Sequence, residues 1–154
     1  MDFIWRYNAR MGKPIPDLAA LEAEAAAFLK TLAPQADSAT LVALSGELGA
    51  GKTAFTKAVA KALGVEEVVT SPTFVLEKIY ALPEGSAFKR LIHIDAYRLD
   101  SGAELAPLGF DELMTDPGNL VFLEWPEKVA DALPAPAARV SLAVSKDGAH
   151  SISY

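Results

Sequence analysis

The spacing of apolar residues predicts alternating helices and strands in the first half of the chain. From Asp17, a good N-cap residue, to about Leu32, apolar side chains recur every three or four positions, as on one face of a helix. Residues 40–44 are almost continuously apolar, which is typical of a buried strand. Helical spacing returns over residues 53–63 and stops at Gly64, so the pattern predicts a helix, a strand and a second helix.

The second half of the chain predicts mainly strands. Residues 74–82 and 88–97 resemble the two strands of a hairpin, with turn residues at 83–86 between them. Residues 120–123 form another short apolar run. Short helices are predicted at residues 103–108 and 110–114, and another helix at 127–133. Two strands are predicted at 139–144 and 149–154, with a turn at Asp147 and Gly148 between them. An opening edge strand is predicted at residues 1–7, and Gly12, Pro14 and Pro16 break it.

Length and composition indicate one globular domain. The chain has 154 residues, of which 51% are hydrophobic, and its sequence contains neither an internal repeat nor a low-complexity linker. A chain of this size can bury a hydrophobic core as a single unit. We therefore expect one compact domain that spans residues 1–154.

Charge and cysteine content narrow the expected partners and compartment. The formal net charge is -6, with 14 basic residues against 20 acidic ones, so a broad nucleic-acid-binding surface is not expected. No cysteine is present, which excludes disulfides, zinc–thiolate sites and thiol chemistry. We see neither a signal-peptide pattern nor an apolar stretch of about 18 residues. These features predict a cytoplasmic protein that does not enter a membrane and that meets nucleic acid through a partner.

Residues 46–53, with the sequence GELGAGKT, fit the P-loop pattern GxxxxGK[ST] at every fixed position. The glycines allow successive backbone N–H groups to point into one concavity, which suits the α- and β-phosphates of a nucleotide. Lys52 would reach the β- and γ-phosphates, and the Thr53 hydroxyl would help to hold Mg²⁺. The predicted strand before the loop and the helix after it are the arrangement that such a phosphate site requires.

Two of the predicted strands end in a carboxylate, at Asp95 and at Glu124. An acid at the end of a strand beside a P-loop strand occupies the Walker B position, where it can meet Mg²⁺ directly or through water. Because a buried carboxylate without a partner or an ion costs free energy, both acids are candidates for this role. His93 alternates with apolar positions, and we interpret it as a core or edge histidine rather than a metal ligand.

A hydroxyl-rich segment at residues 70–74 follows the predicted P-loop helix. Pro72 makes a regular helix or a central strand unfavourable there. The segment is either an ordinary turn before a strand or a loop that senses the γ-phosphate, which many NTPases place after the P-loop helix.

Together, these motifs resemble those of the TsaE (YjeE) family, the P-loop ATPases of bacterial tRNA threonylcarbamoyladenosine synthesis. The P-loop alone would indicate only a superfamily, whereas the Asp-x-Tyr-Arg-Leu and Glu-Trp-Pro motifs are much more specific. Order and spacing agree from about residue 40 to residue 133. The matching pieces are GELGAGKT at residues 46–53, SPTF at 71–74, HIDAYRL at 93–99 and LEWP at 123–126.

The resemblance implies a fold, cofactors and partners. The fold would be α/β, with a P-loop NTPase-like mixed β-sheet flanked by helices. ATP and Mg²⁺ would be bound, and hydrolysis would be weak and dependent on partner proteins. The implied partners are TsaD and TsaB, of which TsaD transfers the threonylcarbamoyl group to an adenosine next to the tRNA anticodon. The ATP cycle of the TsaE protein would support repeated turnover of that complex, and the acidic charge balance agrees with no strong direct binding of tRNA.

Carried over to this chain, the resemblance also implies the site residues. Lys52, Asp95 and Glu124 are the catalytic candidates, and Thr53, Glu124 and Asp95 are the candidates for coordinating Mg²⁺. Which of the two acids orients the attacking water and which holds the metal stays open at this point. The nucleotide-binding candidates are Glu47, Leu48, Gly49, Ala50, Gly51, Lys52, Thr53, Ala54, Thr73 in the sensing loop, and Gly148 in the C-terminal turn.

Two departures from the family pattern affect the nucleotide site. Ala54 stands where family members often have a second threonine, and this could remove one hydroxyl contact to the α-phosphate. Residues 18–28 are nearly all Ala, Leu and Glu, where the family often has hydroxyl residues and a glycine near the base, so the adenine pocket is not predicted. Trp125 and Tyr97 could face the nucleotide or a partner, or could pack in the core.

Other functions are also compatible with a P-loop. A small-molecule kinase would carry the same loop, but such kinases usually close an arginine-bearing lid over the phosphates, and after Arg98 this chain has only Arg139. A non-hydrolysing module could instead assemble a complex according to the nucleotide that it holds. A GTPase is disfavoured because the sequence lacks an Asn-Lys-x-Asp motif.

Overall fold

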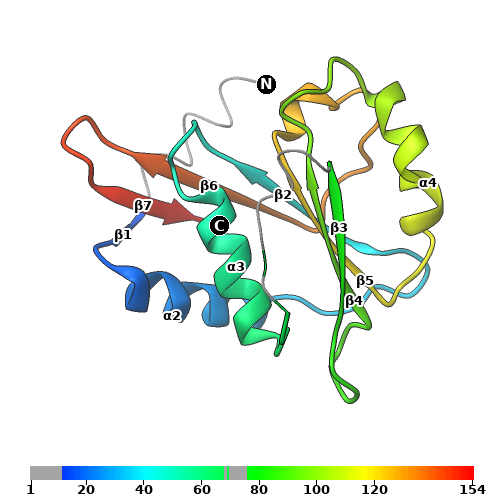
Figure 1. Cartoon of the computed structure of the whole chain (residues 1–154), viewed down its shortest axis with the longest axis horizontal. Helices are drawn as coiled ribbons and strands as arrows, with labels where there is room; N and C mark the ends of the chain where they lie inside the picture. The colour runs from blue at the N-terminus through cyan, green and yellow to red at the C-terminus, as the bar shows by residue number, and fades with distance from the viewer. Residues whose placement is uncertain (1–11, 68, 70–75) are drawn as a thin grey trace.

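The computed structural model describes residues 12–67, 69 and 76–154. These residues form a seven-stranded sheet with the strand order β1-β7-β6-β2-β5-β4-β3 (Figure 1). The predicted mixed α/β fold is therefore confirmed. The strands are β1 (Lys13–Ile15), β2 (Thr40–Ser45), β3 (Glu77–Ala81), β4 (Arg90–Asp95), β5 (Asn119–Glu124), β6 (Ala138–Val144) and β7 (His150–Ser153).

The middle of the sheet is parallel and its edges are antiparallel. β2 pairs in parallel with both β5 and β6, and β4 pairs in parallel with β5. β3 runs antiparallel to β4, β7 to β6, and β1 to β7. The carboxyl ends of β2, β4, β5 and β6 consequently meet at one edge of the sheet, which is where ligands bind in open α/β sheets.

Two helices lie side by side on one face of the sheet. α2 (Leu18–Leu29) begins after Asp17 as predicted, because the Asp17 carboxylate accepts a hydrogen bond from the backbone N–H of Ala20 at 2.8 Å. It ends at Leu29 rather than at Leu32. α3 (Lys52–Ala62) begins directly after the predicted P-loop.

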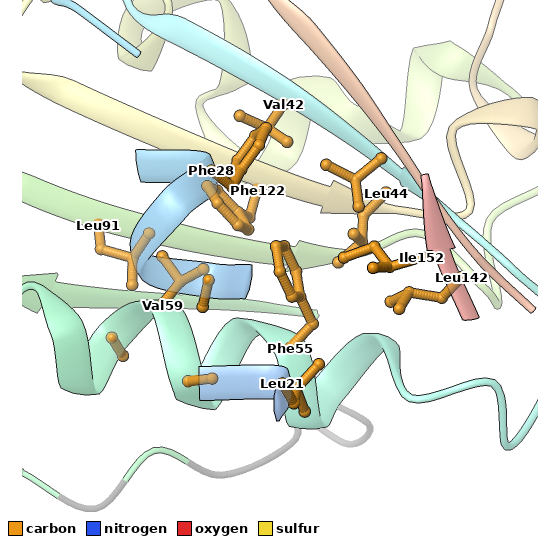
Figure 2. Packing of buried hydrophobic residues seen from close by; sticks show 14 of the residues in the cluster. Leu21, Phe28, Val42, Leu44, Phe55, Val59, Leu91, Phe122, Leu142 and Ile152 are labelled. Atoms are coloured by element: carbon orange, nitrogen blue, oxygen red, sulfur yellow. The ribbon is translucent and has the colours of Figure 1, made fainter. Parts of the chain in front are cut away.

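Aromatic side chains fill the layer between these helices and the sheet (Figure 2). The ring of Phe28 on α2 lies 5.8 Å from that of Phe55 on α3 and 6.2 Å from that of Phe122 on β5, measured between centroids. Phe55 also stacks on Phe122 at 6.3 Å. Burying such large rings is strongly stabilising, so this core fixes the start of α3 against the centre of the sheet.

Short helices cover part of the opposite face. They are the 3₁₀ helix η2 (Gly102–Leu108), α4 (Phe110–Leu113) and the 3₁₀ turn η3 (Pro126–Lys128). Leu105, Phe110 and Val129 pack there with apolar residues of β4 and β5 in a second buried cluster. No helix of the described residues is long and apolar enough to cross a membrane.

The prediction of a helix at residues 127–133 is wrong. Only the turn η3 forms, because tertiary contacts hold the following residues in an irregular path. Val129 is fully buried, and the carboxylate of Asp131 accepts a hydrogen bond from the backbone N–H of Gly102 at 2.8 Å. Ala132 lies so close to Gly102 that a Cβ added at Gly102 would be 2.2 Å from the Ala132 Cβ.

Gly12, Pro14 and Pro16 are predicted to break a strand, but Lys13–Ile15 forms β1. Pro14 pairs with Ser151 of β7, and it is tolerated because β1 is an edge strand, where a residue without an N–H need not break the ladder. The hairpin of β3 and β4 is confirmed, with strands shorter than predicted. The predicted strand at residues 1–7 and the sensing loop at residues 70–74 lie outside the described residues.

Candidate functional site

The predicted P-loop connects the end of β2 to the start of α3. Gly46 lies against β6, where a Cβ would approach the carbonyl oxygen of Leu142 to 2.5 Å. Gly51 precedes α3 with a φ of 106°, a conformation that favours glycine, and no side chain of the described residues caps the start of the helix. A Cβ added at Gly49 or Gly51 would meet no described atom within 4 Å. The loop thus leaves open space beside the positive end of α3, which suits a phosphate group.

Lys52 is buried at the start of α3, with 6% of its surface exposed. Its ammonium group donates hydrogen bonds to the backbone carbonyls of Gly46 and Glu47, the latter at 3.2 Å. Nζ also lies 3.9 Å from the ring centroid of Trp125. Burial lowers the pKa of Lys52 below its usual value, whereas the nearby negative charges, led by that of Glu124, oppose the shift. The ammonium group is therefore held inside the loop.

Asp95 and Glu124 lie next to each other because β4 and β5 are adjacent parallel strands. The two residues are partners in the strand register, so their side chains project to the same face of the sheet. Asp95 is half-buried, and its carboxylate accepts a hydrogen bond from the backbone N–H of Tyr97 at 3.0 Å. Burial raises the pKa of Asp95, the Tyr97 N–H opposes this shift, and the charge of Glu124 adds to it.

Glu124 is almost completely buried, with 2% of its surface exposed. Its Oε2 lies 2.5 Å from Nε2 of His93, which is fully buried on β4. Glu124 also has the largest effect on Lys52 among the acidic groups near that side chain. Lys52, Asp95 and Glu124, which the sequence places far apart, are therefore brought together at the carboxyl ends of the central strands.

The remaining loop residues are distributed around this centre. Glu47, Leu48 and Gly49 form the exposed tip of the loop. Ala50 is buried, and its N–H donates to the carbonyl of Glu47 at 3.0 Å within the loop itself. In the first turn of α3, Thr53 is half-buried and Ala54 is exposed.

The structure describes only one of the two other nucleotide-binding candidates. Thr73 lies outside the described residues. Gly148 forms the turn between β6 and β7, with a φ of 85°. The strand after that turn reaches the P-loop, since Nδ1 of His150 lies 3.2 Å from the carbonyl oxygen of Ala50.

The donor atoms at the site fit Mg²⁺. The hydroxyl of Thr53 and the carboxylates of Asp95 and Glu124 are hard oxygen ligands, which this ion prefers. Among the described residues, no group of three or more His, Cys, Asp and Glu side chains could hold a metal ion. Mg²⁺ is usually bound by one or two carboxylates together with phosphate oxygens rather than by a cage made of protein alone.

A cavity of about 770 Å³ borders the loop on the other face of the sheet. Its lining includes Ser141 and Ala143 of β6, which alternate with core residues and therefore point away from α2 and α3. Gly46, Glu47 and Trp125 also line it. The cavity adjoins the P-loop but lies across the sheet from the face to which Asp95 and Glu124 project.

Comparison with known proteins identifies the family. A family model described as "Threonylcarbamoyl adenosine biosynthesis protein TsaE" matches residues 19–152, which include the loop and both strand-end acids. The chain belongs to the TsaE family. The crystal structure of Bacillus subtilis YdiB has a similar fold, with a TM-score of 0.67 and 26% identity, and the match covers 92% of this chain and 81% of that one.

Several relatives carry the name tRNA threonylcarbamoyladenosine biosynthesis protein TsaE. The protein from Treponema pallidum is 38% identical over 76% of this chain and 82% of its own length. The protein from Streptomyces coelicolor is 43% identical over 60% of this chain and 61% of its own length. The protein from Bacillus subtilis is 33% identical over 85% of this chain and 78% of its own length.

Two aromatic residues of the TsaE motifs meet at the site. Tyr97 follows Asp95 and Trp125 follows Glu124, and their ring centroids are 5.1 Å apart. Tyr97 is 43% exposed, whereas Trp125 is half-buried against the second core. Trp125 has a φ of 60° and is the only non-glycine residue in the described part of the chain with a positive φ. That backbone turn ends β5 and accompanies the placement of the indole beside Lys52.

Two contacts of this TsaE-family site were not predicted. His93 is a core residue as expected, but it also binds Glu124. Its position two residues before Asp95, on the same face of one strand, is a signal that places it near the strand-end acids. The contact between His150 and Ala50 joins segments that are distant in the sequence, and no local pattern indicates it.

Proposed function

We propose that this TsaE-family protein binds ATP with Mg²⁺ at the P-loop and hydrolyses it weakly, with help from partner proteins. The convergence of Lys52, Asp95 and Glu124 beside the open N-terminus of α3 carries this proposal. A cation next to the phosphate loop and acids at the ends of neighbouring strands are the parts that phosphoryl-transfer sites use.

Lys52 would exchange partners when the nucleotide binds. Its ammonium group now donates to the neutral carbonyls of Gly46 and Glu47. Phosphate oxygens are charged acceptors and form stronger hydrogen bonds than carbonyls do. Because the side chain already lies within the loop, little ordering is needed for it to reach a phosphate.

Glu124 is the stronger candidate for a direct metal ligand, since burial and His93 fix its carboxylate. Thr53 would provide the hydroxyl ligand from the first turn of α3. When bound, Mg²⁺ would neutralise charge that develops on the phosphates. Asp95 is less buried, and we assign it to orienting the water that attacks the γ-phosphate.

The names of the relatives support a role in tRNA threonylcarbamoyladenosine biosynthesis. We propose that the ATP cycle supports repeated turnover of a transferase complex of TsaD and TsaB, rather than the transfer to adenosine itself. The net charge of -6 agrees with contact to tRNA through these partners.

A multi-turnover assay of tRNA modification tests this function. TsaD and TsaB would be supplied with and without this protein, first with ATP and then with a nonhydrolysable analogue. We expect several modified tRNA molecules per complex only with the protein and ATP. Sustained turnover with the analogue would instead support a binding module that does not hydrolyse, and a phosphorylated small acceptor formed without TsaD and TsaB would support a kinase.

A further inference from the structure

His93 and Glu124 form a buried pair behind the site proposed for Mg²⁺. Nε2 of His93 and Oε2 of Glu124 are 2.5 Å apart, and the two side chains are 0% and 3% exposed. An ionised carboxylate only accepts hydrogen bonds, so the imidazole nitrogen is the donor. We propose that His93 is a positioning residue that fixes the Glu124 carboxylate for coordinating Mg²⁺. This inference rests on the proposed function and extends it to a residue that does not touch the nucleotide.

The strand register explains why His93 reaches one oxygen of Glu124. In the parallel pair of β4 and β5, Asp95 lies opposite Glu124 and His93 lies opposite Phe122. His93 is therefore a diagonal neighbour of Glu124 on the same face, one step further from the strand ends. Its hydrogen bond occupies Oε2 from the inner side and leaves Oε1 for a ligand.

The other ring nitrogen argues against a purely space-filling role. Nδ1 of His93 is buried and has no hydrogen-bond partner among the described residues. Burying an unpaired polar atom costs free energy, and an aliphatic side chain would fill this position without that cost. The hydrogen bond to Glu124 is the contact that an aliphatic residue could not replace.

The hydrogen bond from His93 would also hold Glu124 away from Lys52. Glu124 exerts the largest charge effect on Lys52 of any acidic neighbour, yet the described side chains of these two residues form no ion pair. A carboxylate released from His93 would be free to turn toward the ammonium group. Glu124 would then be turned away from the metal, whereas Lys52 would stay on the charged phosphate oxygens, which it binds with or without the metal.

The test measures how Mg²⁺ changes the binding of ADP, by calorimetry, so that it does not depend on hydrolysis. In His93→Leu, we expect the Mg²⁺ concentration that gives half of the full effect to rise by about 10-fold to 100-fold, as is usual when the residue behind a metal ligand is lost. ADP affinity in EDTA should not change. His93→Gln should recover most of the Mg²⁺ effect, because its amide N–H can donate to Glu124.

Leu91→Ala is the matched control. Leu91 is fully buried on the same face of β4, two residues before His93. It should lower stability without changing the Mg²⁺ dependence, because the register places it opposite Leu120, four residues before Glu124 on β5. Equal shifts in Leu91→Ala and His93→Leu would show that only core packing matters and would overturn the inference. In a Glu124→Gln background, His93→Leu should have no further effect on Mg²⁺ dependence.

Two further results separate this inference from the proposed function. If His93→Leu does not fold, His93→Asn takes its place, since its shorter amide does not reach Glu124 and should give the same shift. An unchanged Mg²⁺ dependence in the folded variant overturns the positioning role alone. If ADP binding by the unaltered protein does not respond to Mg²⁺, the metal site itself is overturned, together with this inference.

Discussion

The ends of β4 and β5 carry acids at equivalent positions, but the two carboxylates are held in different ways. Asp95 is half-buried and accepts a hydrogen bond from Tyr97, two residues further along its own turn. Glu124 is 2% exposed and is held by His93 from the neighbouring strand. One contact is local in the sequence, and the other depends on the pairing of two strands.

This difference separates two kinds of chemical role. A carboxylate fixed by a second side chain within the core can present one oxygen at a constant position, which a metal ligand requires. A carboxylate at the edge of the site, held only by a turn, can adjust to a mobile water molecule. We therefore expect Glu124 and Asp95 to respond differently to substitution, although they are partners in the register.

Glu124→Ala should have the largest effect. We expect partner-stimulated ATP hydrolysis to fall by about 1000-fold or more, that is, to background, since the substitution removes the proposed metal ligand. The rate of phosphate release with TsaD and TsaB present is the measurement. Glu124→Gln keeps the volume and an acceptor for His93, so it controls for folding and should be similarly inactive. Full activity in both variants would exclude Glu124 from the mechanism.

Lys52→Ala should lower stimulated hydrolysis by about 100-fold or more. The reason is that the cation that would stabilise negative charge on the phosphates is lost. Unlike Glu124→Ala, it should weaken ADP binding in EDTA as well, since the ammonium group would contact phosphate without the metal. Calorimetry in EDTA separates the two variants. Equal ADP affinity in Lys52→Ala and the unaltered protein would show that Lys52 stays on the carbonyls of Gly46 and Glu47 when nucleotide is bound.

Asp95→Asn should have a smaller effect, which is a change in the free energy of unfolding that depends on pH. Because burial raises the pKa of Asp95 in the folded protein, the folded form binds more protons than the unfolded one between the two pKa values. The free energy of unfolding therefore falls as pH rises through this window, and this loss of stability is complete above the folded pKa of Asp95. Asn carries no charge and keeps an oxygen acceptor for the Tyr97 N–H.

Because Asp95 is only half-buried and solvent screens its charge, we expect metal-free Asp95→Asn to be more stable than the unaltered protein by less than about 1 kcal/mol at pH 7. The gain should vanish as pH falls below the unfolded pKa of about 3.9. Urea denaturation over this pH range measures it. A constant difference at all pH values would show that Asp95 is as well stabilised in its charged form as it is in the unfolded chain.

The sequence predicted the local parts of this site better than the contacts between them. Residues 46–53 follow a motif whose spacing alone determines a loop and a helix start, and both acids were found because an apolar strand ends directly before each. The pairing of His93 with Glu124 was not predicted, since it requires the register of β4 against β5. A sequence pattern places a residue on a face of a strand, but it does not place one strand beside another.

The errors in the predicted fold have the same origin. Residues 127–133 have a helical pattern, but the hydrogen bond between Asp131 and Gly102 and the burial of Val129 override it. Pro14 was expected to interrupt a strand, and it is accommodated because β1 lies at the edge of the sheet. In both places, the position of the segment in the fold decides its conformation, and local propensity does not.

Tyr97→Leu should have the smallest effect. Tyr97 is 43% exposed, and its ring contacts Trp125 at a centroid distance of 5.1 Å and lies 5.9 Å from Nζ of Lys128. Such exposed aromatic and cation–π contacts contribute about 1 kcal/mol or less, so the loss of stability in urea should stay within that range. Trp125→Leu should cost more, because Trp125 packs against the second core. An equal loss of stability in Tyr97→Leu and Trp125→Leu would show that the end of β4 depends on tertiary packing, as the end of β5 does. The distinction between an adjustable Asp95 and a fixed Glu124 would then lose its structural basis.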